Sequence, residues 1–427
     1  MQKDTKDLKQ EFEKDTYEGL LKDIYIDETM LDYQKERYIR AIDQFEKTFG
    51  RKNVEIYSSP GRSEIGGNHT DHQYGRVLAA AINIDAIAIV SRTDDNTITV
   101  KSEGYPMTKV HLDFFEPMQG EYGTSSGLIR GVAAKIKKEG YKVGGFEAYI
   151  TSDVLNGAGM SSSAAFEVLI GSILSGLYNG LKIPEVVIAK AGQYAENKFF
   201  GKPCGLMDQM ACAVGNLIYI DFANMEDPCV RKVNVNFEDF KYSLCIVDTK
   251  GSHANLTDEY AAIPEEMKMV ANYFGKKVLN EVKRGEFYKN LPGIREKLGD
   301  RAVLRALHWF EETERVVTQV EALEAGNFDV FKFLVAESGD SSFEFLQNIY
   351  STKDVSNQAV AIGLAVSKVV LRAKGVCRVH GGGFAGTIQA FVPNRMVNTY
   401  KEKIEKVFGK GACHILKIRK YGGVKVL

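Results

Sequence analysis

The sequence predicts an α+β protein of two domains, in which helices pack on mixed β-sheets. The chain has 427 residues, 44% hydrophobic and 26% charged, enough to bury two cores. Short apolar or alternating runs typical of strands occupy residues 54–100, 145–154 and 378–392. Longer patterns typical of helices occupy residues 162–181, 184–200, 265–284, 300–325 and 328–345.

These elements divide the chain into three parts. The charge-rich residues 1–45 predict an N-terminal helical extension. We expect residues 46–215 to form an N-terminal domain and residues 216–427 to form a C-terminal domain. No repeat or low-complexity linker marks the boundary, so we place it by motif content. Residues 86–100 predict a hairpin that turns at Asp94–Asn96, which makes the first sheet mixed.

Composition excludes several classes of partner. The net charge is −1, so the basic surface needed for nucleic acid or an anionic membrane is not expected. No stretch reaches the roughly 18 uninterrupted apolar residues of a membrane span. The six cysteines form no C-x-x-C pair, and the N-terminus lacks the apolar run of a signal peptide. We therefore expect reduced thiols in a cytoplasmic protein.

The most informative segment is LNGAGMSSSAAF, residues 155–166, between a predicted strand and a buried helix. Gly157 and Gly159 permit close approach of a ligand to the backbone, and Ser161–Ser163 offer capping hydroxyls and amide N–H groups at a helix start. It lacks the lysine of a Walker A loop and the third glycine of G-x-G-x-x-G. The segment predicts a phosphate-binding loop of another type. The alternative is a tight turn before a well-capped helix.

A second polar loop, SSPGRSEIGGNHTDHQYG, spans residues 58–75. Glycines allow its turns, which carry hydrogen-bonding side chains. A carboxylate such as Asp71 can accept from two adjacent sugar hydroxyls. A small polyol is the ligand that we predict. A solvated surface loop is the alternative. Zinc binding by His69 and His72 is the weakest reading, since no third ligand lies at helical spacing.

A third segment, QYAENKFFGKPCGLMDQ at residues 193–209, places Asp208 among apolar residues. A buried acid is costly unless it is paired, so Asp208 either caps a helix or serves chemistry. A carboxylate that accepts the proton of a sugar hydroxyl suits phosphoryl transfer, and a nearby cation such as Arg62 would keep it ionised. We assign Ser163 and Glu196 as oxygen ligands of Mg²⁺. The glycine-rich segment HGGGFAG, residues 380–386, adds weaker evidence for a ligand site.

These segments, in this order, resemble the signatures of the GHMP family of small-molecule kinases, over roughly residues 45–427. The likeness is greatest to members that phosphorylate galactose. It implies a GHMP-kinase-like fold with the active site in the cleft between the domains, and Asp208 and Arg62 as catalytic residues. It also implies sugar contacts from Asn68, His69, Thr70, Asp71, Gly205 and Tyr260. The ATP phosphates would contact Gly157, Ala158, Gly159, Met160, Ser161, Ser162 and Ser163, with Ser163 and Glu196 on Mg²⁺.

One departure from the family pattern concerns the sugar. The usual first motif reads N-x-I-G-E-H-T-D-Y, and here it reads E-I-G-G-N-H-T-D-H, so Asn68 stands where a glutamate is expected. The expected reaction is ATP-dependent phosphorylation of galactose at its anomeric hydroxyl, by a cytoplasmic monomer or homodimer. The alternatives are a kinase for N-acetylgalactosamine, arabinose or galacturonate, and a non-catalytic regulator that binds galactose and ATP.

Overall fold

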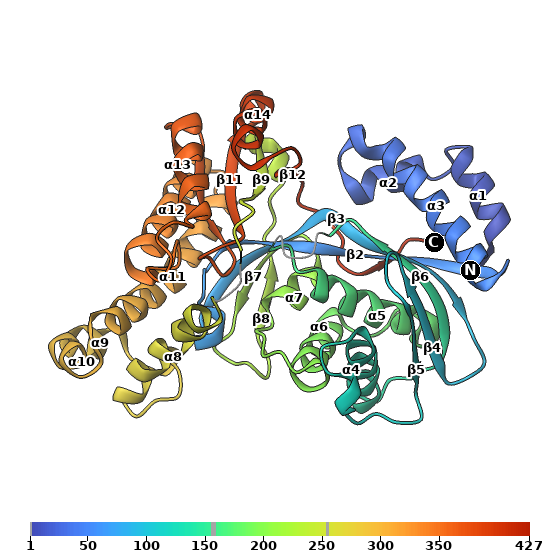
Figure 1. The fold of residues 1–427 in the computed structure, drawn as a ribbon, viewed down its shortest axis with the longest axis horizontal. Coiled ribbons are helices and arrows are strands. Elements are labelled where there is room, and N and C mark those ends of the chain that lie inside the picture. The colour runs from blue at the N-terminus through green and yellow to red at the C-terminus, as the bar shows by residue number, and fades with distance from the viewer. Residues whose placement is uncertain (1, 155–158, 253–255) are drawn as a thin grey trace.

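The computed structural model describes residues 2–154, 159–252 and 256–427, and it has the mixed α+β architecture that the sequence predicts (Figure 1). Among these residues, nine strands form the larger sheet, in which the long strands β2 and β3 are central. The strands are β1 (Lys3–Asp4), β2 (Asn53–Gly66), β3 (Arg76–Arg92), β4 (Thr97–Ser102), β5 (Met107–His111), β6 (Phe146–Ser152), β7 (Leu217–Asp221), β8 (Cys229–Lys232) and β13 (Val424–Lys425).

The predicted hairpin over residues 86–100 is wrong. A turn does join β3 to β4, but β6 lies between them, antiparallel to β3 and parallel to β4. Strand β3 is buried along most of its length and needs a partner on each edge. The apolar strand β6 fills one edge through a pairing distant in sequence, which a local turn pattern does not encode.

Helices cover both faces of the larger sheet (Figure 1). Alternate residues of β3 point to opposite faces of the sheet. Ala86 and Ala88 belong to the apolar core on one face, and Ile87 and Ile89 belong to the core on the other. The first core is covered by α4 (Ser125–Lys138), α5 (Ser162–Asn179), α6 (Glu185–Ala195) and α7 (Met207–Val214). The second is covered by the N-terminal helices α1 (Thr5–Glu13), α2 (Glu18–Tyr25) and α3 (Leu31–Phe49).

The smaller sheet is antiparallel, in the order β10-β11-β9-β12. Its strands are β9 (Tyr242–Asp248), β10 (Val376–His380), β11 (Thr387–Pro393) and β12 (Cys413–Leu416). The accompanying helices are α8 (Thr257–Tyr273), α9 (Arg284–Lys289), α10 (Leu291–Leu298), α11 (Asp300–Glu324), α12 (Phe328–Ser341), α13 (Ala359–Leu371) and α14 (Val397–Phe408). The helix predicted over 265–284 is displaced: α8 begins earlier and ends before Gly275, whose φ of +68° breaks the helix.

The two sheets do not divide the chain at a single point. Strands β7, β8 and β13 lie beyond residue 215, yet they belong to the larger sheet. The boundary between residues 215 and 216 stays a prediction. In the part of the chain that the structure describes, no helix has the length and apolar character needed to cross a membrane.

Three buried charges connect the N-terminal helices, the larger sheet and the C-terminal tail. Arg37 of α3 and Arg419 flank Asp85 of β3, and all three side chains are fully buried. Arg37 Nη1 lies 2.7 Å from Asp85 Oδ1, and Arg419 Nη1 lies 3.0 Å from Asp85 Oδ2. The Tyr25 hydroxyl donates to Asp85 Oδ2 at 2.9 Å. Burial opposes ionisation of Asp85, but the two arginines outweigh it and hold its pKa below the ordinary value.

Candidate active site

Asp208 and Arg62 form the centre of the site. Asp208 lies in the first turn of α7, and Arg62 lies near the end of β2. Arg62 Nε and Nη2 lie 2.6 and 2.8 Å from the two Asp208 oxygens, a bidentate ion pair. Burial opposes ionisation of Asp208, but Arg62 outweighs it, so the pKa of the carboxyl is lower than usual. Asp208 is therefore an anion at neutral pH, and its side chain is 33% exposed.

The predicted phosphate-binding loop, residues 157–163, is called the glycine-rich loop below, and its described end contacts this ion pair. Arg62 Nη1 donates to the Gly159 carbonyl, and the Ser161 hydroxyl donates to Asp208 Oδ2. Gly159 has a φ of +67°, and a Cβ there would lie 2.7 Å from Thr387 Oγ1. Only glycine fits this position without strain. The loop, the acid and the arginine are thus held as one unit.

The serines after the loop do not cap α5 as predicted. Among the described residues, no side-chain hydrogen bond caps this helix, and Ser161 before it has a φ of +57°. A capping residue normally has an extended backbone, from which its oxygen accepts a helix N–H, and the left-handed backbone of Ser161 departs from this geometry. Its hydroxyl donates instead to the Asp208 carboxylate. The Met160 side chain is fully buried in the core. Gly157 and Ala158 lie outside the described residues.

A second carboxylate lies beside the end of the loop. Glu196 opens a π-helical turn, η4 (Glu196–Phe200), of a kind that recurs at functional sites. Its Oε1 lies 3.3 Å from Ser163 Oγ and 2.9 Å from Lys202 Nζ. The Lys202 ammonium shows that this oxygen attracts a cation, and a hydroxyl with a carboxylate suits Mg²⁺. Within residues 2–154, 159–252 and 256–427, no three His, Cys, Asp or Glu side chains form a metal cage.

Asp71 lies in the polar loop of residues 58–75, called the sugar loop below because it carries most of the predicted sugar contacts. It brings this loop to the turn that precedes Asp208. A Cβ at Gly205 would lie 2.0 Å from Asp71 Oδ2, so glycine makes room for this carboxylate. Burial, with the negative charges of Asp208 and Glu64, raises the pKa of Asp71 to about 6. Two acids with opposite pKa shifts therefore lie close together, an arrangement typical of functional sites.

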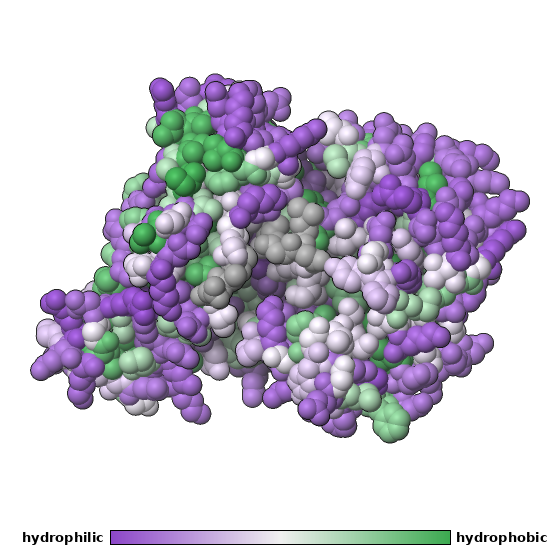
Figure 2. All heavy atoms as spheres, viewed as in Figure 1, coloured by the Kyte–Doolittle hydropathy of each residue, from purple (hydrophilic) through white to green (hydrophobic). Residues whose placement is uncertain are grey.

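The HGGGFAG segment packs against residues from both halves of the molecule. The Tyr260 hydroxyl donates to the Gly383 carbonyl at 2.8 Å, and His69 Nε2 lies 3.1 Å from the Gly382 carbonyl oxygen. The rings of Tyr260 and Phe384 meet edge to face, with centroids 5.4 Å apart. Figure 2 shows that the molecular surface is hollowed at the lower edge of the view, between the part that carries α8 and the part that carries α4 and α6.

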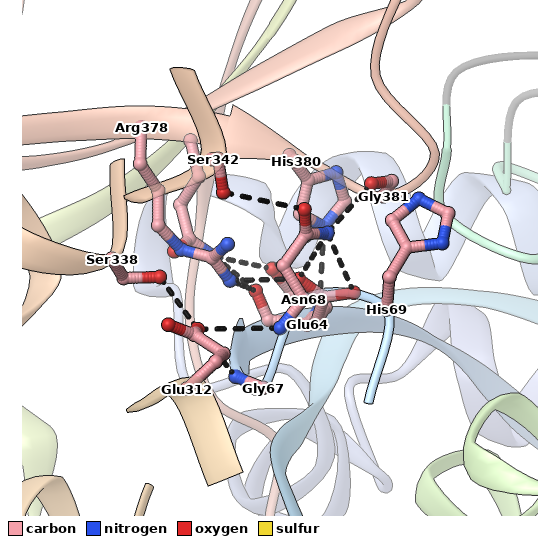
Figure 3. Close-up of polar contacts among 12 residues, drawn as sticks. Glu64, Gly67, Asn68, His69, Glu312, Ser338, Ser342, Arg378, His380 and Gly381 are labelled. Carbon is pink, nitrogen blue, oxygen red and sulfur yellow. Dashed lines mark hydrogen bonds and ion pairs between the residues drawn. The ribbon is translucent and has the colours of Figure 1, made fainter. Parts of the chain in front are cut away.

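Asn68 is enclosed by protein groups, as Figure 3 shows. Its side chain is fully buried, and Nδ2 donates to Glu64 Oε1 at 3.1 Å and to the Gly381 carbonyl at 2.8 Å. Its Oδ1 accepts from Asn348 Nδ2 at 3.0 Å. Both amide donors are thus used within the protein. The geometry favours a role for Asn68 in joining the loop to the C-terminal half over the predicted sugar contact.

Thr70, a second predicted sugar contact, is also fully buried. Its hydroxyl lies 3.0 Å from the Gly67 carbonyl oxygen and 2.6 Å from that of Arg76. One hydroxyl proton is therefore shared between two carbonyls of the same loop. Thr70 closes the loop on itself and supports its shape.

Sequence reasoning missed the acid that holds this loop. Glu312 Oε1 accepts from the backbone N–H of Gly67 at 3.1 Å and of Asn68 at 3.3 Å, and from the Ser338 hydroxyl at 2.6 Å (Figure 3). Burial opposes ionisation of Glu312, but Arg315 and other positive groups outweigh it and lower its pKa to about 2. A signal did exist, because Glu312 falls at helical spacing from buried apolar residues of α11.

A buried ion pair of Arg378 with Glu64 was missed as well. Arg378 Nη2 lies 2.9 Å from Glu64 Oε1, and the two side chains are 0% and 5% exposed (Figure 3). Glu64 also accepts from Asn68, so the pair links β10 to the sugar loop. The residues are distant in sequence and no local pattern relates them.

Comparison with known proteins agrees with this arrangement. Residues 127–216 match the GHMP kinases N terminal domain, and residues 43–92 match the galactokinase galactose-binding signature. A galactokinase of Glaesserella parasuis serovar 5 (strain SH0165) is 30% identical over 371 residues, which cover 86% of this chain and 92% of that protein.

Solved structures give the same family. Lactococcus lactis galactokinase complexed with galactose has a TM-score of 0.76 and 25% identity, covering 90% of this chain and 98% of that one. Methanococcus jannaschii mevalonate kinase shares the fold, with a TM-score of 0.61 and 16% identity, covering 86% of this chain and 98% of that one. The predicted GHMP-kinase fold is therefore confirmed. The chain belongs to the galactokinase family of GHMP kinases.

Proposed function

We propose that this chain transfers the γ-phosphoryl group of ATP to the anomeric hydroxyl of galactose, releasing galactose 1-phosphate and ADP. The observation that carries the proposal is the Asp208 carboxylate, paired with Arg62 and bonded to Ser161 beside the glycine-rich loop. A sugar kinase needs an acceptor-side carboxylate within reach of groups that bind phosphate.

In this reaction Asp208 orients the anomeric O–H and takes its proton. The sugar oxygen bonds to the γ-phosphorus, and the bond from that phosphorus to the β,γ-bridging oxygen breaks, leaving the electron pair on ADP. Because the pKa of Asp208 is lowered, it is a weak base. Proton transfer is therefore late, after the attacking oxygen has become acidic. Arg62 contributes positive charge beside the transferring group.

The glycine-rich loop would hold the ATP phosphates, from Gly157 through Ser163, at the positive end of the α5 dipole. Ser163 and Glu196 fit Mg²⁺ by donor type and separation, and they would hold it. When bound, the metal neutralises charge on the phosphates. Glu196 would supply its ligand oxygen from a side chain that is only 4% exposed, so water competes little with the metal for that oxygen.

The sugar would contact His69, Asp71, Gly205 and Tyr260, while Asn68 and Thr70 hold the loop in shape. A kinase for a related sugar is the second candidate. It is favoured because Asn68 stands where the family has a glutamate, and its amide hydrogens are bonded within the protein. We propose a cytoplasmic monomer or homodimer, in keeping with six cysteines that are all free thiols.

An ADP-release assay with Mg·ATP tests the function over galactose, its 2-acetamido analogue, glucose, arabinose and galacturonate. We expect galactose to give the highest kcat/KM. A preference for another sugar would select the second candidate. Binding of galactose without release of ADP on any sugar would identify a non-catalytic regulator and refute the enzyme.

Galactose affinity should depend on pH through Asp71. The ionised carboxylate accepts from sugar hydroxyls, and its pKa is raised to about 6. Affinity should therefore be full above that pH and weaken below it, by about tenfold per pH unit for one coupled proton. Calorimetric titration of galactose without nucleotide measures this directly. The Asp71→Asn variant should bind galactose weakly at every pH, with no further loss of affinity below pH 6. A loss of affinity at low pH that persists in this variant would show that another group causes it.

A further inference from the structure

Gln209 joins two carboxylates behind the candidate site. Its side chain is fully buried in α7, and Nε2 lies 3.0 Å from Glu167 Oε2 and 3.0 Å from Glu196 Oε2. Both hydrogens of the amide are therefore directed at carboxylate oxygens. Gly192 makes room for this arrangement, because a Cβ there would lie 2.9 Å from Glu167 Oε2 and 3.0 Å from Gln209 Cγ.

These contacts give the two oxygens of Glu196 different surroundings. Oε2 accepts from Gln209, whereas Oε1 lies beside Ser163 Oγ and Lys202 Nζ. The terminal torsion of a glutamate is soft, so the carboxylate can rotate unless one oxygen is held. The amide fixes that torsion from inside the protein, and the other oxygen then stays turned to Ser163.

Glu167 gives a reason for an amide at position 209. This acid of α5 is fully buried, and its Oε1 has no hydrogen-bond partner among the described residues. Burial and the charge of Glu196 raise the pKa of Glu167 well above its ordinary value. An acid at position 209 would add a third carboxylate to this buried space, and an apolar side chain would leave Glu167 Oε2 and Glu196 Oε2 without this donor. An amide donates to both oxygens.

We propose that Gln209 is a positioning residue for the Mg²⁺ that binds with the nucleotide. It holds Glu196 Oε2, so that Glu196 Oε1 and Ser163 Oγ present a fixed pair of oxygens. The inference rests on the proposed function in one respect, that Glu196 and Ser163 are the metal ligands. Gln209 itself contacts neither the metal nor the substrate.

The test compares calorimetric binding of ADP with and without Mg²⁺. Mg²⁺ should strengthen ADP binding by the parent protein, and Gln209→Met should reduce that gain about tenfold, the effect typical of losing a group that orients a metal ligand. Binding of metal-free ADP and of galactose should change little. A general structural defect would weaken all three measurements, so the selective loss separates positioning from packing.

Glu167→Gln is the matched variant, because it keeps an acceptor for Gln209 and should retain the Mg²⁺ gain. Thermal unfolding checks each variant, and Gln209→Asn replaces Gln209→Met if the latter does not fold. A retained gain in a folded Gln209 variant would overturn the proposal. If only Glu196→Gln loses the increase in ADP affinity that Mg²⁺ causes, Glu196 is a metal ligand but Gln209 does not position it. If Glu196→Gln keeps this increase, Glu196 is not a metal ligand. The kinase activity is then tested separately by the sugar assay.

Discussion

Replacing Asp208 with asparagine should lower kcat by about 10³-fold, the middle of the range for loss of a proton acceptor. Asparagine has nearly the same shape, and it can still accept from Ser161. It cannot take the proton of the anomeric hydroxyl, and it cannot form the charged pair with Arg62 that the native acid forms at 2.6 and 2.8 Å. KM for galactose should change much less than kcat.

Steady-state ADP release measures this effect, and circular dichroism checks the fold. Asp4→Asn is a matched control, since both Asp4 oxygens accept from Arg51 Nε at 2.9 Å, at the opposite end of β2 from Arg62. The control should keep nearly normal kcat. Near-normal turnover by Asp208→Asn would remove Asp208 from the mechanism, whereas an equal loss in both variants would indicate a stability defect.

Replacing Arg37 with methionine should lower the free energy of unfolding by about 3–5 kcal/mol, the range for removing one member of a buried ion pair. Asp85 would keep Arg419 but lose the hydrogen bond and charge at its other oxygen. The Asp85 side chain is 0% exposed, so bulk solvent does not replace the lost interaction. The loss should also loosen α3 from the larger sheet.

Urea unfolding, followed by a spectroscopic signal from the buried core, measures this change in the free energy of unfolding. Lys9→Met is the control, because Lys9 pairs with Asp43 at 2.6 Å with both side chains 34% exposed. Such a surface pair contributes about 0–1 kcal/mol. Equal losses in the two variants would show that burial does not amplify the Asp85 interactions.

Helix periodicity predicted much of the fold, because side-chain burial repeats locally. The helix expected over 300–325 is α11 (Asp300–Glu324), and the buried helix expected over 162–181 is α5 (Ser162–Asn179). The strand expected over 145–154 is β6 (Phe146–Ser152). Its place between β3 and β4 was missed, since sheet order depends on pairings distant in sequence.

In the candidate site, too, local patterns could be read from the sequence, whereas contacts between distant residues could not. Asp208 attracted notice because an acid among apolar residues needs a partner, and the pair with Arg62 spans 146 positions. The burial of Asn68 could not be foreseen, because its partner Asn348 lies 280 positions away. The motif places Asn68 in the sugar loop, but only the folded chain shows which groups surround its amide. The roles assigned to the site residues stay predictions.

The larger sheet cannot be completed until the C-terminal tail, which carries Arg419 and β13, has been synthesised. Arg419, which neutralises Asp85, follows it by 334 residues, and β13 pairs with β2 only after that. At 5–20 residues per second, synthesis of that stretch takes about 20–70 s. Even after β8 has been made, the nascent larger sheet lacks β13 and one cation of its core. Chaperone capture on the ribosome should therefore extend until Arg419 and β13 have emerged.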